Sequence, residues 1–208
     1  MPGSACAPSP TSSRPTRRPG GGSVAAFCGA MSAALTSMVA NLTVGRKGYE
    51  KAQKEVKALA VRAQKHKDDL LRAVDLDAAA FNKVMDALKL PRANDEQKAE
   101  RDKALETATQ EATLVPFQVL ESSIVLVKLA KKVALKGNKN SLSDAGVAAL
   151  AAQTAGEGAY YNVRINLPGI QDAEFKARIK KQAVALKKKL CALADEVRAI
   201  VERELRKG

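Results

Sequence analysis

The sequence predicts an all-α protein, a single helical-bundle domain of long antiparallel helices. Ala, Leu, Val and Lys are abundant, whereas aromatic residues make up only 3% of the 208 residues, which suits helices packed through small and aliphatic side chains. Apolar residues recur every three or four positions over long stretches, and no stretch shows the alternation of a β-strand. A hydrophobic share of 46% is enough for one sizeable core.

Residues 1–18 differ in composition from the rest of the chain. They are rich in Pro, Ser, Thr and Arg and contain no acidic residue, so we expect a disordered tail, followed by a helical domain over residues 19–208. The tail also resembles an organelle transit peptide, although it lacks a clear amphipathic pattern. A wrongly assigned start codon would explain it equally well.

The segment 23–45 is uncharged, which is typical of a membrane span and also of a buried helix. Small residues recur along it at Ala26, Ala30 and Ala33, and they would let a second helix approach closely. Ser, Thr and Asn occur throughout. We therefore expect a core helix and no contact with a membrane.

Apolar periodicity and capping residues predict the remaining helices. The predicted ranges are 50–89, 95–115, 117–135, 144–161 and 172–206. Asn94 or Asp95 is expected to cap the second of these, and Asp172 the last. Pro116 is expected to kink or break the chain between its two neighbours. Ser141 or Ser143 is the expected cap of the helix that starts near residue 144.

The net charge of +13 favours anionic partners such as nucleic acid, acidic lipid or a polycarboxylate ligand. The basic run 176–189 contains no aromatic residue, so we interpret it as a solvated helix face and expect no nucleic-acid partner. Three separated cysteines and one histidine indicate neither a metal site nor a disulfide framework. A reducing, cytoplasmic location is the expectation.

The stretch PGGGS precedes the small-residue helix. Its glycines permit a ligand to approach the backbone closely, and its serine can cap the helix. Exposed N–H groups at a helix start attract anions. The stretch is not a P-loop, because Gly-Lys-Ser/Thr and a preceding strand are both missing. A plain loop and cap is the alternative interpretation of Gly20, Gly21, Gly22 and Ser23.

The stretch VDLDAAAF contains two aspartates. Asp75 and Asp77 are two residues apart, so on a helix they point in nearly opposite directions. Asp77 follows Val74 by three residues and precedes Phe81 by four, so its carboxylate is expected on the packed side. A carboxylate there suits proton transfer, although a buried capping or ion-paired aspartate is the alternative.

Polar residues also gather at the predicted helix ends. Amide side chains there can bind a heterocycle, or they can simply cap the helices. Asn41 lies in the small-residue helix, where a buried polar group needs a partner. The other candidates are Asn138, Ser143, Asp144, Asn162 and Asn166.

Together these motifs resemble the cyclodeaminase/cyclohydrolase family, which includes the C-terminal domain of formimidoyltransferase-cyclodeaminase and methenyltetrahydrofolate cyclohydrolase. The resemblance covers about residues 13–205 and is carried by PGGGSVAA, MVANLTVGRKGY, DLDAAAF, LPRANDEQKAER, SDAGVAA and NVRINL. It departs from the family before the glycines, where Arg17 replaces a proline and a preceding helix is missing.

The resemblance implies an all-helical homodimer with a tetrahydrofolate site near the dimer interface. It implies a cyclodeaminase that converts 5-formimidoyltetrahydrofolate to 5,10-methenyltetrahydrofolate and ammonia, with Asp77 as the proton shuttle and no cofactor beyond the folate. By motif position, the other candidate residues line the pocket. The positive charge favours the glutamate tail of folate, including its polyglutamylated form. Methenyltetrahydrofolate cyclohydrolase, or a non-catalytic protein that binds an acidic partner, is the alternative.

Overall fold

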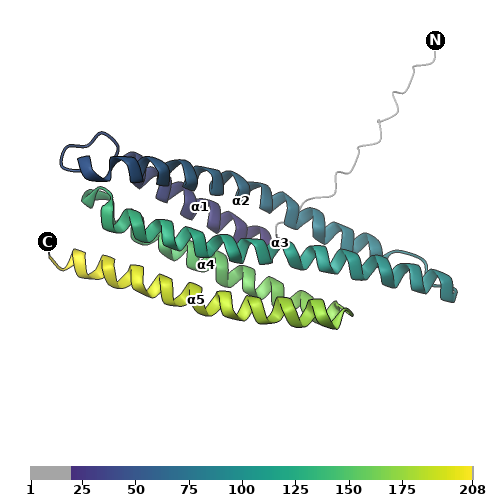
Figure 1. Cartoon of the computed structure of the whole chain (residues 1–208). Helices are drawn as coiled ribbons and strands as arrows, with labels where there is room; N and C mark the ends of the chain where they lie inside the picture. Colours follow the sequence, from purple (N-terminus) through teal and green to yellow (C-terminus); the bar gives the residue numbers. More distant parts are fainter. Residues whose placement is uncertain (1–19, 208) are drawn as a thin grey trace, which may run out of the picture.

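The computed structural model describes residues 20–207, and within them it forms five long α-helices joined by short connections (Figure 1). The helices are α1 (Gly21–Asn41), α2 (Gln53–Leu88), α3 (Asp95–Lys136), α4 (Leu142–Asn166) and α5 (Ala173–Leu205). Three single-turn 3-10 helices are η1 (Glu50–Ala52), η2 (Lys139–Ser141) and η3 (Leu167–Gly169). Consecutive long helices run antiparallel, and the described residues contain no strand, so the predicted all-α fold is confirmed. The predicted tail lies outside the described residues.

The helix α3 is the centre of the bundle, since it packs against all four other long helices. The helix α1 lies between α2 and α4, while α5 packs against α3 and α4 at the opposite edge from α2. The α2–α3 hairpin extends beyond the ends of α4 and α5 (Figure 1). Consequently α1 begins beside Asp77, in the second half of α2, and leaves the last turns of α2 uncovered.

The helix α1 packs as a core helix, as its small residues predict. Ala26 and Ala33 are fully buried, which lets α2 and α4 approach closely. By length and hydropathy both α1 and α3 could cross a membrane, but 61% and 56% of their apolar windows are buried inside the bundle.

Two of the predicted helix caps are confirmed. The side chain of Asn94 accepts a hydrogen bond from the N–H of Gln97, and that of Asp172 accepts one from the N–H of Phe175. Pro116 neither ends nor splits the chain's longest helix, because α3 continues through it.

The expectation that Phe81 marks the packed side of α2 is wrong. Phe81 is 61% exposed, and Met85 and Leu88 are also exposed. These residues follow Asp77, at the level where α1 begins, so no described helix covers them on this side. The spacing of apolar residues indicated which side of α2 is apolar, but it could not show how far α1 extends along that side.

The loop between α1 and α2 is fixed against the start of α4. Thr43 Oγ1 accepts a hydrogen bond from the N–H of Asn138 at 2.8 Å, and the hydroxyl of Tyr49 accepts one from the N–H of Lys139 at 3.0 Å. Gly45 and Gly48 have positive φ angles of 71° and 87°, a conformation that favours glycine. Hydrogen bonds therefore fix the polar groups of the loop and of the start of α4 to one another at this end of the bundle.

Candidate active site

Three helices bring predicted site residues together near the middle of the bundle. They are the first turn of α1, the second half of α2 and the C-terminal part of α4. Asp77 lies at the centre of this cluster and is half-buried. Its carboxylate faces α1, which is consistent with the expected position on the packed side of the helix.

The hydroxyl of Ser23 links α1 to Asp77. Its Oγ lies 2.8 Å from Oδ2 of Asp77 and 3.3 Å from the carbonyl oxygen of Val74. Ser23 is only 1% exposed, so bulk water has almost no access to its hydroxyl group. A carboxylate that accepts a hydrogen bond from a buried hydroxyl is held in one orientation.

The prediction that Ser23 caps α1 is wrong. The N-cap residue is Gly20, which has an extended conformation, and Ser23 lies inside the first helical turn. Its side chain therefore points across to α2 instead of back to the N–H groups of its own helix. The sequence contained the correct residue types, but the helix starts three residues earlier than a cap at Ser23 requires.

Gly22 provides the space for the carboxylate of Asp77. A Cβ atom added to Gly22 would lie 2.1 Å from Oδ1 and 2.6 Å from Cγ of Asp77, far inside van der Waals contact. The carboxylate thus lies directly against the backbone of the first turn of α1. The partial positive charge of a helix N-terminus favours a negative group at this place.

Asn162 forms the α4 side of the cluster. A Cβ atom added to Gly21 would lie 3.1 Å from its Nδ2, and that nitrogen donates a hydrogen bond to the carbonyl oxygen of Gly158 at 2.8 Å. The amide is therefore oriented by its own helix and lies against the glycines of α1. It can present its carbonyl oxygen to a ligand.

Asn166, one turn further along α4, has a role that follows from Pro116. Because proline has no N–H, the carbonyl oxygen of Ala112, four residues earlier, lacks its usual helical partner. The Nδ2 of Asn166 donates to that oxygen at 2.9 Å. The amide group of Asn166 thus stabilises α3, so its side-chain nitrogen is already engaged.

Replacing Asn166 with alanine is expected to lower the free energy of unfolding by about 1–2 kcal/mol, because the Ala112 carbonyl would lose its partner. In a Pro116→Ala background the restored N–H can bond to that carbonyl, so the cost of Asn166→Ala should fall below about 0.5 kcal/mol. Urea unfolding of the four proteins measures this coupling. Equal costs in both backgrounds would show that Asn166 does not compensate for Pro116.

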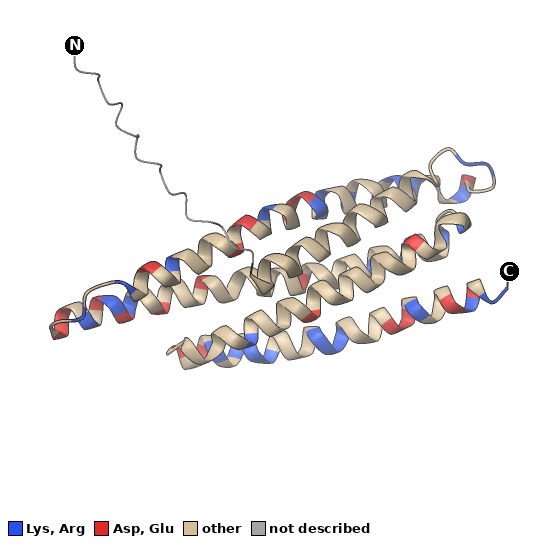
Figure 2. Cartoon of the chain, turned by 180° about the vertical axis from the view of Figure 1, so that it is seen from behind, with Lys and Arg blue, Asp and Glu red and all other residues tan. Residues whose placement is uncertain are grey.

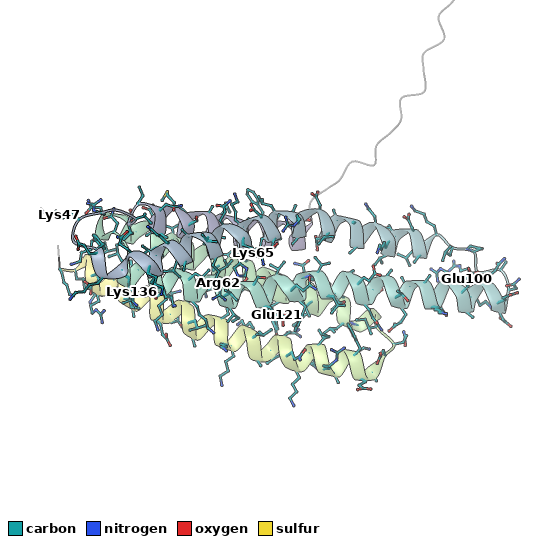
Figure 3. The ribbon with its side chains drawn as sticks, turned by 45° about the horizontal axis from the view of Figure 1, so that its top comes forward. Lys47, Arg62, Lys65, Glu100, Glu121 and Lys136 are labelled. Carbon is teal, nitrogen blue, oxygen red and sulfur yellow. The ribbon has the colours of Figure 1, made fainter. Side chains whose placement is uncertain are left out.

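Four predicted site residues lie at the other end of the bundle. Asn41 is the last residue of α1, and the rise of an α-helix places it about 27 Å from Ser23. Lys47 and Lys136, labelled in Figure 3, lie at the same end of the bundle as Asn41. The other three lie at the start of α4: Asn138, Ser143 and Asp144. One chain alone does not bring them to Asp77.

The expectation that Asn41 is buried is wrong. It is exposed, and its Nδ2 lies 3.4 Å from the hydroxyl of Ser37. Asn138 is buried and caps η2. Of the two serines expected to cap α4, Ser141 is the N-cap residue, although its side chain makes no capping hydrogen bond, whereas Ser143 is exposed and lies inside the helix.

The carbonyl of Val74 is a site group that the sequence analysis missed. It lies one turn before Asp77 on the same helix face, and that spacing is the signal that could have indicated it. Within residues 20–207 no three His, Cys, Asp or Glu side chains lie close enough to hold a metal ion.

The chain is thus an all-α helical bundle in which an aspartate lies against the glycine-rich start of a helix. The sequence profile of the formiminotransferase-cyclodeaminase family matches residues 11–185, and the chain belongs to this family. The resemblance noted in the sequence is thereby confirmed.

Individual relatives have two different activities in their names. The methenyltetrahydrofolate cyclohydrolase of Methylorubrum extorquens is 39% identical over 89% of this chain and 88% of the relative. The formimidoyltransferase-cyclodeaminase of Sus scrofa is 39% identical over 81% of this chain, which spans only 31% of that protein. The crystal structure of formiminotetrahydrofolate cyclodeaminase from Thermotoga maritima superposes with a TM-score of 0.81 at 30% identity and covers 92% of both chains.

Proposed function

We propose that this protein hydrolyses 5,10-methenyltetrahydrofolate to 10-formyltetrahydrofolate, with Asp77 as the proton-transferring group. The observation that carries the proposal is the half-buried carboxylate held by Ser23 and Gly22 at the start of α1. The choice of reaction is supported by the cyclohydrolase relative, which matches over 88% of its own length.

The chemistry requires a group that takes and returns a proton. Water adds to the methenyl carbon between N5 and N10 and releases one proton to solvent, which gives a neutral carbinolamine. The carbinolamine O–H then loses its proton as C=O forms and the bond from carbon to N5 breaks, and N5 must gain a proton. Asp77 can accept the proton from the hydroxyl and deliver it to N5, a role worth about 10²–10⁴ in rate.

Cyclodeamination is the second candidate, and it is favoured by the structural similarity to the Thermotoga maritima enzyme over 92% of both chains. Here N10 attacks the formimidoyl carbon on N5, the bond to the departing nitrogen breaks, and ammonia leaves. That nitrogen must be protonated because an amide anion is too poor a leaving group. The same carboxyl group of Asp77 can supply the proton.

The two reactions have opposite optical signals. The purified protein is supplied separately with 5,10-methenyltetrahydrofolate and with 5-formimidoyltetrahydrofolate, and the methenyl absorbance is followed. Loss of absorbance with the first substrate identifies the cyclohydrolase, and its appearance with the second identifies the cyclodeaminase. Turnover of neither substrate would refute both candidates.

Polyglutamylated substrates should bind more tightly, since the net charge is +13.

A homodimer is part of the proposal. The helix α1 contains no Lys, Arg, Asp or Glu and is tan throughout in Figure 2, yet one side of it faces outward, away from α3. Its exposed large apolar side chains are Val24, Phe27, Met31, Met38 and Leu42, and those of α4 are Val147, Leu150, Tyr161 and Ile165. Exposed apolar side chains in this number on two packed helices mark an interface, and the proposed occupant is a second copy.

If a twofold axis passes near Met31, the middle residue of α1, the α1 helices of the two copies would pack against each other in antiparallel orientation. The Asn41 end of one chain would then lie over the Ser23 end of the other. This arrangement would bring the polar groups at the start of α4 in one copy towards Asp77 of its partner. It accounts for predicted site residues at both ends of the bundle.

Replacing Met31 with glutamate is expected to convert the dimer into a folded monomer, because the charge would be buried at the centre of the interface. Val61→Glu on α2, outside this face, is the matched control, since Val61 is 73% exposed. Light scattering after size-exclusion chromatography measures the mass of each protein. A wild-type monomer, or a dimeric Met31→Glu protein, would contradict the proposed interface.

A further inference from the structure

The two oxygens of the Asp77 carboxyl group have different surroundings. Oδ2 accepts the hydrogen bond of Ser23 at 2.8 Å. Oδ1 lies on the Gly22 side and has no hydrogen-bond partner among residues 20–207. The carboxyl group is therefore asymmetric before any substrate is present.

The hydroxyl of Ser23 is itself confined to α2. Its second possible acceptor is the carbonyl oxygen of Val74 at 3.3 Å, three residues before Asp77 on the same helix. A serine hydroxyl has one proton to donate, and the shorter contact with the carboxylate is the stronger bond. Because Ser23 is buried, water does not compete for it.

We propose that Ser23 is a positioning residue for Asp77: it holds Oδ2 and leaves Oδ1 as the atom that exchanges the proton with the substrate. The inference rests on the proposed function. It changes the expected role of Ser23 from contacting the substrate to holding the carboxylate of Asp77. In the ionised state Ser23 donates to Oδ2. When Oδ1 gains a proton, Oδ2 becomes the carbonyl oxygen and still accepts the same bond, so the group need not turn between receiving and releasing the proton.

The predicted effect is on the rate and not on substrate affinity. Without the hydroxyl, the carboxyl group can rotate and bind the proton on either oxygen. Ser23→Ala should lower kcat about tenfold, the order expected for a hydrogen bond to a charged group, and change KM less than twofold. Ser23→Thr, which keeps the hydroxyl, should restore most of kcat.

A double-mutant cycle with Asp77→Ala separates this role from a merely structural one, because alanine accepts no hydrogen bond. If Ser23 acts through Asp77, Ser23→Ala should have no further effect on the residual rate in that background. Ser37→Ala is the matched control, since Ser37 also donates from α1 to a carbonyl of α2, that of Ala60 at 3.3 Å. It should leave kcat within twofold of wild type.

The same cycle is measured by urea unfolding, which needs no turnover. Ser23→Ala should raise the unfolding equilibrium constant about tenfold in the wild-type background and less than threefold when residue 77 is alanine. Additive effects on unfolding would overturn the assignment of Ser23, whatever the substrate is. A wild-type kcat retained by Ser23→Ala would also overturn it. Failure of the wild-type protein to turn over either folate, with coupling intact, would refute the proposed function alone.

Discussion

Replacing Gly22 with alanine is expected to lower turnover about 100-fold. The new methyl group would occupy a position 2.1 Å from Oδ1 of Asp77, so the carboxyl group must move by more than 1 Å. A displacement of that size at a reacting group costs about 10²-fold in rate. Overpacking should also reduce the free energy of unfolding by about 1–3 kcal/mol. Steady-state rates and urea unfolding of the purified variant check both effects.

The matched control is Gly29→Ala, seven residues further along the same helix. There the added Cβ would approach the flexible end of the Leu70 side chain at 3.1 Å, which can shift by a few tenths of an ångström. This variant should keep its rate within about threefold of wild type. If Gly22→Ala were as active as Gly29→Ala, close contact between Gly22 and Asp77 would not matter for turnover.

Replacing Asp77 with asparagine is expected to lower turnover about 10³-fold. The amide has nearly the same volume and can still accept the hydrogen bond of Ser23, but it cannot carry a proton to the leaving nitrogen. The fold and the affinity for a non-reacting folate should change little. Circular dichroism and titration with 5-formyltetrahydrofolate measure these two properties.

Asp75→Asn is the control for this change. Asp75 is exposed on the same helix, and its spacing from Asp77 directs it away from α1. The substitution makes the same chemical change and the same change in net charge, and it should leave turnover within about twofold. Equal losses at the two positions would indicate a general effect of charge on α2.

The helices could be predicted because their signals are local. Apolar periodicity indicated where each helix lies, and the caps at Asn94 and Asp172 depend on residues three positions away. The positions that were wrong depend on neighbours instead. Phe81 is exposed because α1 begins beside Asp77, and Asn41 is exposed because it ends its helix.

The site could be predicted only in its residue types. The motifs made candidates of Asp77, Gly22 and Ser23. The aspartate and the serine are 54 positions apart in the sequence, so their contact is seen only when α1 packs on α2. The role of Asn166 also depends on a distant carbonyl, that of Ala112. Sequence motifs indicate which side chains matter, whereas tertiary contacts decide what each one does.

The central claim is that Asp77 transfers the proton in a folate one-carbon reaction. It is tested most directly by the rate of change of methenyl absorbance at saturating substrate, measured for wild type and Asp77→Asn under the same conditions. The predicted result is measurable turnover by wild type and a loss of about 10³-fold in the variant, with binding of 5-formyltetrahydrofolate retained. An Asp77→Asn protein within tenfold of the wild-type rate would contradict the claim.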